Sequence, residues 1–275
     1  MNYSELKKIS NRNRIRILDM VYYGNSGHIG GSFSAVDIIT YLGEYVIDYE
    51  KKDRNRFILS KGHAVPALYA ELNELGLVRD DELRGFRRIN SRLQGHTNIQ
   101  YLSESDITTG LLGQGLSYGV GIALGKKLKS SRDTVFVMIG DGETHEGQIW
   151  EALMEAGHYK LDNLVLIIDR NGLCSHQPVE NVISIEPLRD RLEAFGWNVK
   201  EIDGHSMEQI DSCINGLAAQ YGKPKCIIAH TVKGKGVSFM ENNGIWHRNV
   251  PTEREYEKAR QELIRYGELL DERRL

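Results

Sequence analysis

The stretch that decides the fold is TVFVMIGDGETHEGQIWEALMEAGHYKLDNLVLIIDRN, residues 134–171. Its ends, 134–139 and 164–168, are continuous apolar runs rich in β-branched residues, as strands buried on both faces are. Between them, apolar residues recur at helical spacing from Ile149 to Ala156. Strand, helix and strand in this order predict a βαβ unit, and therefore a parallel sheet with helices on both faces.

The flanking sequence continues this alternation. Short strands are predicted at 57–59, 197–202 and 225–229, and the apolar spacing over 210–221 predicts a helix between the last two. We therefore expect an α/β fold, a three-layer sandwich around a central, mainly parallel sheet. Because the chain shows no internal repeat and no linker, residues 1–275 are expected to form a single domain.

Helices are predicted at both ends of the chain. Residues 1–23 have an amphipathic pattern, and Ser34 is a candidate N-cap for a second helix whose apolar positions continue to Leu42. At the other end, 253–275 is expected to carry a charged surface helix, with its helical pattern over 253–270.

The composition excludes several classes of protein. With 27% charged residues, a net charge of −3 and no run of about 18 apolar residues, the chain is expected to bind neither membrane nor nucleic acid. Residues 1–10 are polar and do not predict a secretory signal. The three cysteines have neither metal-ligand spacing nor the density of a disulfide scaffold, so a cytoplasmic location is expected. The 28 glycines exceed the usual share of about 7%.

Polar residues follow both strands of the central stretch. Asp141 follows the first apolar run and Asn171 follows the second, at the sheet edge where ligands bind in such folds. A carboxylate and an amide oxygen suit Mg²⁺ or Ca²⁺ and do not suit zinc. Gly142 would let a phosphate approach the backbone, and a helix beginning near Glu146 would direct N–H groups at that anion. A turn with Asp and Asn chosen only for local conformation would give the same residues.

Two other motif hypotheses fail. The segment 145–149 begins like the HExxH motif of zinc proteases, but its fifth residue is Ile149. The glycines between Gly110 and Gly119 do not match GxGxxG and do not follow a clear strand, so a nicotinamide site is not predicted.

The spacing from Asp141 to Asn171 is that of the thiamine diphosphate signature, and other segments extend the match. In chain order they are SGHIGG (26–31), LSKGHAVPALYA (59–70), LQGH (93–96), TTGLLGQGLSYGVGIALG (108–125), DGHS (203–206), TVKGKG (231–236) and WH (246–247). This ordered set runs from about residue 10 to about residue 252 and resembles the transketolase family.

The resemblance implies thiamine diphosphate as cofactor, with Mg²⁺ or Ca²⁺. Asp141, Asn171 and the backbone carbonyl of Leu173 match the metal ligands. The implied cofactor-binding positions are Lys61, His63, Gly110, Leu112, Gly142, Glu143, Asn171, Lys233 and His247. Several donors around one metal ion suit a diphosphate, because its charge exceeds that of the ion.

The resemblance also implies four catalytic histidines, His28, His63, His96 and His247. Of these, His28 and His96 match positions that face the reactive carbon of the cofactor and the donor ketose, where an imidazole can move protons. Glu146 and Glu151 match glutamates that relay protons at a subunit interface, although a solvated helix face would give the same residues.

The other histidines match no catalytic position and are expected to be structural. They are His145, His158, His176, His205 and His230. The chain departs from the family pattern at Ile29, Leu111, Arg248 and the segment 174–176, which leaves the substrate open.

The implied activity is that of a transketolase-type transferase, in which the cofactor acts as electron sink and a two-carbon ketol unit passes from a ketose or ketose phosphate to an aldose or aldose phosphate. No segment resembles the pyrimidine-binding half of the family. We therefore expect the N-terminal subunit of a split enzyme, active with a C-terminal subunit, as an α₂β₂ heterotetramer. Two alternatives stay open: a subunit of another thiamine diphosphate enzyme, deoxyxylulose-phosphate-synthase-like or 2-oxoacid-decarboxylating, and a non-catalytic scaffold subunit.

Overall fold

A parallel sheet forms the centre of the computed structural model, which describes residues 1–217 and 221–272. In this part of the chain the sheet has five strands in the order β1-β2-β3-β7-β6, and every neighbouring pair is parallel. The strands are β1 (Arg56–Leu59), β2 (Val135–Gly140), β3 (Leu164–Arg170), β6 (Asn198–Asp203) and β7 (Lys225–His230); a short antiparallel pair, β4 (Leu173–Cys174) and β5 (Gln177–Pro178), follows β3. The mainly parallel sheet expected from the sequence is confirmed.

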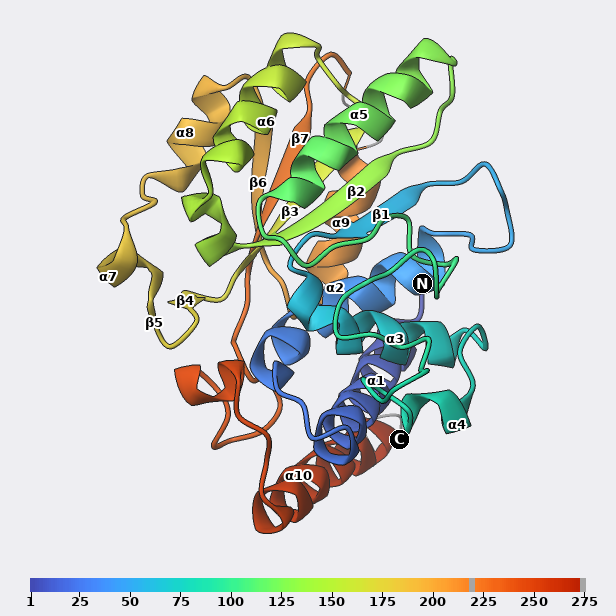
Figure 1. Cartoon of the computed structure of the whole chain (residues 1–275). Coiled ribbons are helices and arrows are strands. Elements are labelled where there is room, and N and C mark those ends of the chain that lie inside the picture. Colours follow the sequence, from blue (N-terminus) through green and yellow to red (C-terminus); the bar gives the residue numbers. More distant parts are fainter. Residues whose placement is uncertain (218–220, 273–275) are drawn as a thin grey trace.

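Helices cover both faces of this sheet (Figure 1). Because side chains alternate along a strand, Phe136 and Met138 of β2 join one hydrophobic core, whereas Val137 and Ile139 join the other. The first core includes residues of α1 (Tyr3–Tyr23), α2 (Ile29–Tyr45), α3 (Val65–Glu74), α9 (Met207–Leu217) and α10 (Glu253–Glu272). The second includes residues of α5 (Gln114–Leu128), α6 (Gly147–His158) and α8 (Leu188–Ala194). The three-layer sandwich is therefore confirmed.

Short helices occupy the connections between these elements. They are η1 (Gly62–Ala64), α4 (Asp80–Leu83), η2 (Asp141–His145), α7 (Val179–Val182) and η3 (Gly244–His247). Three of them, η1, η2 and η3, contain or adjoin residues that the sequence singles out. None of the described helices combines the length and the apolar character that a bilayer crossing needs.

The start of the second helix differs from the sequence prediction. α2 begins at Ile29, after His28 in the left-handed backbone conformation with φ 81°. Ser34 is therefore inside the helix and is not its N-cap; its hydroxyl donates a hydrogen bond to Asp169 Oδ2 at 2.6 Å. The same hydroxyl lies 3.1 Å from the Gly31 carbonyl oxygen, so it bonds oxygens of β3 and of the helix and does not cap a free backbone N–H.

Two other helices also differ from the expected pattern. α9 is described to Leu217, residues 218–220 lie outside the described part, and Tyr221 is exposed, so it does not extend the buried face of this helix. α10 lies at the outside of the molecule, but it is more than a charged surface helix, because Tyr256, Ala259 and Leu263 are buried in the first core. Residues 273–275 of the expected C-terminal helix lie outside the described residues.

Candidate functional site

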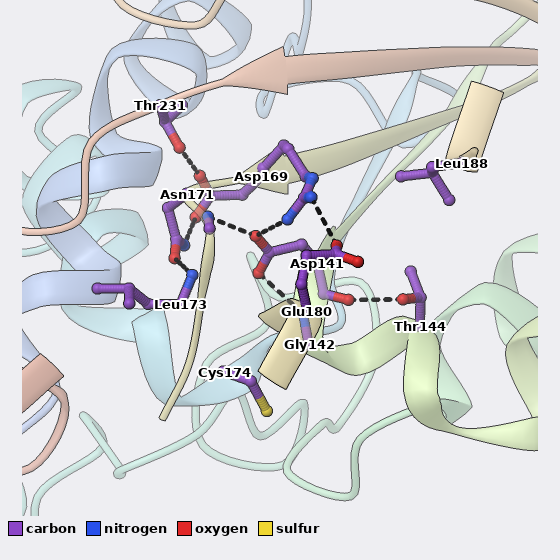
Figure 2. Close-up of polar contacts among 12 residues, drawn as sticks. Asp141, Gly142, Thr144, Asp169, Asn171, Leu173, Cys174, Glu180, Leu188 and Thr231 are labelled. Carbon is purple, nitrogen blue, oxygen red and sulfur yellow. Dashed lines mark hydrogen bonds and ion pairs between the residues drawn. The ribbon is translucent and has the colours of Figure 1, made fainter. Parts of the chain in front are cut away.

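The carboxyl ends of β2 and β3 place Asp141 next to the segment 169–173. The last register pair of these strands is Gly140 with Asp169, so each following residue leaves the sheet at the same edge. The Asp141 carboxylate accepts hydrogen bonds from the backbone N–H of Gly142 at 2.8 Å and of Gly172 at 2.6 Å, and Arg170 lies 3.2 Å from its Oδ2 (Figure 2). Burial and the nearby Asp169 raise the pKa of Asp141, while these donors oppose the shift.

Asn171 is oriented by a carboxylate that the sequence motifs do not single out. Asp169 is fully buried, and its Oδ2 accepts a hydrogen bond from Asn171 Nδ2 at 3.2 Å. It also pairs with Lys61 and accepts from Ser34 and Thr231. With its N–H₂ group held in this way, Asn171 directs its carbonyl oxygen elsewhere, where it accepts from Leu173 N at 3.2 Å. An aspartate two residues before Asn171, at the end of a buried strand, was the available signal.

Lys233 lies in this region without an anionic partner. It is 2% exposed, and its ammonium group donates to the carbonyl oxygens of Leu173 at 3.3 Å and Ser175 at 3.1 Å. Burial, and then the charge of Lys61, lower the pKa of Lys233 to about 8. The described residues offer it no carboxylate ion pair. A buried ammonium group with carbonyl partners alone would gain from a bound anion.

The residues at this edge of the sheet suit a metal cation whose remaining coordination positions are filled by a bound ligand. Among the described residues, no three His, Cys, Asp or Glu side chains gather into a metal cluster. A cation beside Asp141 would therefore be held by one carboxylate, by neutral oxygens such as Asn171 Oδ1 and the Leu173 carbonyl, and by oxygens of the ligand itself. Mg²⁺ is commonly bound in this way, through one or two carboxylates and substrate phosphates.

Three histidine rings meet beside these groups. The ring centroids of His28 and His63 are 5.2 Å apart, those of His28 and His247 are 5.3 Å apart, and those of His63 and His247 are 5.2 Å apart. His96 lies beside Gly110, where an added Cβ atom would meet its ring at 3.2 Å. In the described part of the chain, the rings of these four residues, which we call the unpartnered histidines, have no hydrogen-bond partner.

The unpartnered histidines are held in their neutral form. Burial lowers the pKa of His28 to about 4 and that of His247 to about 3, with further lowering by nearby positive charges. The pKa of His63 is also well below its ordinary value, chiefly because of burial, and that of His96 is lowered for the same reason. A neutral imidazole can accept a proton or donate its single N–H, so these rings suit a ligand rich in hydroxyl and phosphate groups.

The segment 108–113 borders the same region and exposes apolar side chains. Gly110 has φ 137°, a conformation that only glycine adopts easily. Leu111 is 79% exposed and Leu112 is 37% exposed, so both can cover a flat ring or a second chain. The prediction that Leu112 packs on the cofactor rings stays a prediction.

Glu143 and Gly142 have partners inside the chain. The buried carboxylate of Glu143 accepts from Gly113 N at 2.9 Å and Gly140 N at 3.2 Å, and it also bonds Ser60 Oγ. It therefore fixes backbone around the site. At Gly142 an added Cβ would meet Cys174 Sγ at 2.9 Å, so the sulfur already limits this position to glycine.

The proposed relay glutamates are exposed, and the histidines expected to be structural have partners inside the chain. Glu146 and Glu151 are exposed on and beside α6, as is Met154. His205 is bonded through both nitrogens: Nδ1 lies 2.6 Å from Asp37 Oδ2, and Nε2 accepts from Val232 N at 2.8 Å. The other histidines contact neighbouring groups: His145 the Ile183 carbonyl and Cys174 Sγ, His176 the Gly244 carbonyl and the His247 ring, His230 Glu201, and His158 the Tyr159 ring.

Comparisons with known proteins identify the family of this chain. A family model described as "Transketolase, thiamine diphosphate binding domain" matches residues 6–266. One subunit of the apulose-4-phosphate transketolase of Phocaeicola vulgatus is 41% identical over 98% of both chains, and a 6-deoxy-6-sulfo-D-fructose transketolase subunit of a Clostridium species is 39% identical over 88% of this chain and 90% of its own.

Solved structures show the same likeness in three dimensions. The transketolase of Campylobacter jejuni superposes with a TM-score of 0.89 at 32% identity, over 96% of this chain and 43% of that one. The chain thus spans less than half of the length of such single-chain relatives. On these matches, the chain belongs to the transketolase family, whose thiamine diphosphate binding domain it contains.

Proposed function

We propose that this chain is the diphosphate-binding subunit of a two-chain transketolase, which transfers a two-carbon ketol unit from a ketose donor to an aldose acceptor. This proposal rests on one observation. The unpartnered histidines lie close to Lys233, which has no carboxylate ion pair in the described residues, and both lie beside Asp141 and Asn171. The donor we favour carries an anionic group, phosphate or sulfonate, because the two subunit relatives are named for a sugar phosphate and a sulfo sugar.

In this proposal the strand ends hold the metal ion and the diphosphate. Asp141, Asn171 Oδ1 and the Leu173 carbonyl would ligate Mg²⁺ or Ca²⁺. Lys233, Lys61, His63 and His247 would surround the diphosphate, with the Gly142 backbone close by. Glu143 would act indirectly, because its hydrogen bonds position Gly113 and Gly140.

The remaining side chains would handle the sugar. Thiamine diphosphate, when bound, supplies an electron sink for breaking the bond next to the ketose carbonyl. His28 and His96 would bind sugar hydroxyls through their ring nitrogens and accept or return the hydroxyl proton that moves when that bond breaks. Their lowered pKa values keep these rings neutral at neutral pH, so that one nitrogen of each ring can accept a proton while the other carries the N–H. Gly110 and Leu112 would border the cofactor rings.

We also propose that a C-terminal subunit completes the site, as an α₂β₂ assembly. Three features support this: the subunit names of the relatives that match this chain end to end, the fraction of single-chain transketolases that it spans, and the exposed Leu111 and Leu112 beside the site. Glu146 and Glu151 would then lie at a subunit interface and carry protons between active sites.

The test is a ketol-transfer assay with thiamine diphosphate and Mg²⁺, on this chain alone and with its C-terminal subunit. We expect activity only from the pair. The substitution D141A should lower it by more than about 100-fold, because even outer partners of metal ligands typically cost 10- to 100-fold. The control D190N removes an exposed carboxylate on α8 and should leave activity unchanged.

Several outcomes would contradict the proposal. Transfer by the isolated chain would refute the partner requirement. Decarboxylation of a 2-oxoacid without ketol transfer would indicate another thiamine diphosphate enzyme. A pair that binds no thiamine diphosphate in a calorimetric titration would leave only a scaffold role.

A further inference from the structure

The backbone on both sides of Lys233 is held by side chains that the proposed function does not use. On one side, Val232 N donates a hydrogen bond to His205 Nε2 at 2.8 Å. On the other side, the Lys235 carbonyl oxygen accepts from Arg14 Nε at 3.0 Å. The short segment that carries Lys233 is therefore fixed at two points by buried or partly buried side chains from other parts of the chain.

Asp37 joins His205 to Arg14. Its Oδ2 lies 2.6 Å from His205 Nδ1 and 2.6 Å from Arg14 Nη2, and its Oδ1 accepts from Arg14 Nη1 at 3.1 Å. Burial opposes the ionisation of Asp37, but Arg14 and His205 hold its pKa well below its ordinary value. Because His205 Nε2 accepts from the N–H of Val232, the ring proton is on Nδ1 and is donated to the Asp37 carboxylate.

The same contacts tie the segment of Lys233 to α2, the helix that begins directly after His28. Asp37 lies on this helix, and Gly234 N donates a hydrogen bond to the carbonyl oxygen of Gly30 in its first turn at 3.0 Å. The helix that follows His28 and the segment that carries Lys233 are thus joined both at the start of α2 and farther along it.

His205 reaches the candidate site only through this backbone. With Arg14, Asp37 and Lys235, it lines a separate cavity of about 470 Å³, together with residues of α1 and α10. Among the described residues that line this cavity, none belongs to the proposed metal, cofactor or sugar contacts. The ring of His205 therefore has no direct access to a bound cofactor.

We propose that His205 is a positioning residue for the diphosphate of the cofactor: its ring, held by Asp37, fixes the backbone N–H of Val232 and thereby the point from which Lys233 extends to the anion. This inference rests on the proposed binding of thiamine diphosphate and adds a residue that sets the affinity without touching the cofactor. A lysine side chain is flexible and acts as a point charge, so its backbone largely decides where the charge lies. At Lys233 only two carbonyl oxygens hold the ammonium group.

The test measures the affinity of the two-chain enzyme for thiamine diphosphate, by calorimetric titration at saturating Mg²⁺. In H205N, the side-chain amide can replace ring Nδ1 and donate to Asp37, but it leaves Val232 N without its acceptor. In H205Q, the amide oxygen can replace ring Nε2 and accept from Val232 N, but the bond to Asp37 is lost. We expect H205N to weaken binding by about 10-fold, because the bond next to Lys233 is lost, and H205Q to restore most of the affinity.

Two measurements separate positioning from a merely structural role. The control H230Q removes an exposed histidine that lies two residues before Val232 and bonds Glu201, and it should leave the affinity unchanged. Urea unfolding ranks the same variants by stability, and the titrations are run well below every unfolding midpoint. A structural role would make affinity follow stability, whereas positioning makes it follow the bond to Val232. Equal affinities of H205N and H205Q would therefore overturn the inference.

A double substitution tests whether His205 acts through Lys233. K233Q alone should weaken binding by about 10- to 100-fold, because a hydrogen bond from a charged group is lost. H205N should then add little in the K233Q background, since the ammonium group that it displaces is already absent. Effects that multiply in full would show that His205 acts by another route and would overturn the inference.

These binding measurements also keep the inference apart from the proposed function. If the pair binds thiamine diphosphate with the expected order of affinities but transfers no ketol unit, the positioning role stands and the proposed function fails. If the pair transfers ketol units and its affinity is the same in the wild type, H205N and H205Q, the function stands and the positioning role fails.

Discussion

His205 and the unpartnered histidines are the same residue type in opposite situations. His205 bonds Asp37 through one ring nitrogen and the backbone N–H of Val232 through the other, so the fold uses its full hydrogen-bonding capacity. The rings of His28, His63 and His247 contact one another and have no such partners in the described part of the chain. Partly buried polar groups usually find partners in a folded protein. The difference therefore separates a histidine that holds the fold together from histidines kept ready for a ligand.

The largest effect on stability is expected at Asp169, a carboxylate that both supports the fold and positions a residue of the candidate site. This carboxylate pairs with buried Lys61 and also orients Asn171. The substitution D169N would leave the ammonium group of Lys61 buried without its ion pair, which typically costs about 3–5 kcal/mol. Urea unfolding of the variant should show this loss. The control D190N should unfold like the wild type, and an unchanged midpoint for D169N would show that Lys61 finds another partner.

The second prediction tests the comparison itself. H205A leaves Asp37 and the Val232 N–H short of a partner and should destabilise the protein by about 1–3 kcal/mol. H28A removes a ring without hydrogen-bond partners and should change stability far less, while ketol transfer by the two-chain enzyme should nearly vanish. Urea unfolding and the transfer assay, run on both variants, measure the two effects. Equal destabilisation by H205A and H28A would remove the distinction between the two kinds of histidine.

The third prediction concerns pH. The folded-state pKa values of His28 and His247 are about 4 and about 3, below the ordinary value near 6.5. Between these limits the unfolded chain binds more protons than the folded one, so stability falls as pH drops below about 6.5. The chain without cofactor should therefore lose thermal stability from pH 7 to pH 5. In H247N the loss should be smaller, and a loss of the same size would mean that other groups cause it.

The sequence predicts the scaffold and the chemical residues better than it predicts their support. The strands are legible because apolar runs such as 164–168 have no other stable environment than a sheet covered on both faces. Asp141 and Asn171 follow from their positions after two such strands. Asp169 and Ser34 were missed as supports because their role depends on a contact between residues 135 positions apart. No local pattern could show that the Ser34 hydroxyl serves β3 and does not cap a helix.

The beginning of α2 shows the same limit. Local rules favour Ser34 as the N-cap, because its hydroxyl can bond a free backbone N–H. The structure begins the helix at Ile29, after His28 in a left-handed conformation, and this places the ring of His28 beside those of His63 and His247. The requirement of the site overrides the local preference, as is common where side chains serve function and not folding.

The smallest effect on stability is expected at the buried carboxyl group of Glu71, which tests whether a missing hydrogen-bond partner always marks a binding site. Glu71 is fully buried; its Oε2 accepts a hydrogen bond from Asn13 Nδ2 at 2.8 Å, but its Oε1 has no hydrogen-bond partner in the described residues. The backbone of Gly43 covers this oxygen so closely that an added Cβ would collide with it, and no ligand can therefore reach Glu71. Burial, together with nearby Glu44, raises the pKa of Glu71 well above its ordinary value and so favours the protonated carboxyl group. An unpartnered group marks a binding site only where a ligand has access to it.

A raised pKa contributes stability at low pH that is lost as pH rises toward the folded-state pKa. E71Q keeps the shape of the protonated carboxyl group and removes this loss, so the variant should be more stable than the wild type at pH 8. The matched control is E74Q in the same helix, where Arg12 and Arg16 hold the pKa of the carboxylate below its ordinary value. E74Q should lower stability slightly, because those ion pairs are partly exposed. Thermal unfolding at pH 6 and pH 8 measures both variants. If E71Q is less stable than the wild type at pH 8, the Glu71 carboxylate is ionised and stabilised in the folded protein, and the rule that access separates the two kinds of unpartnered group loses its clearest case.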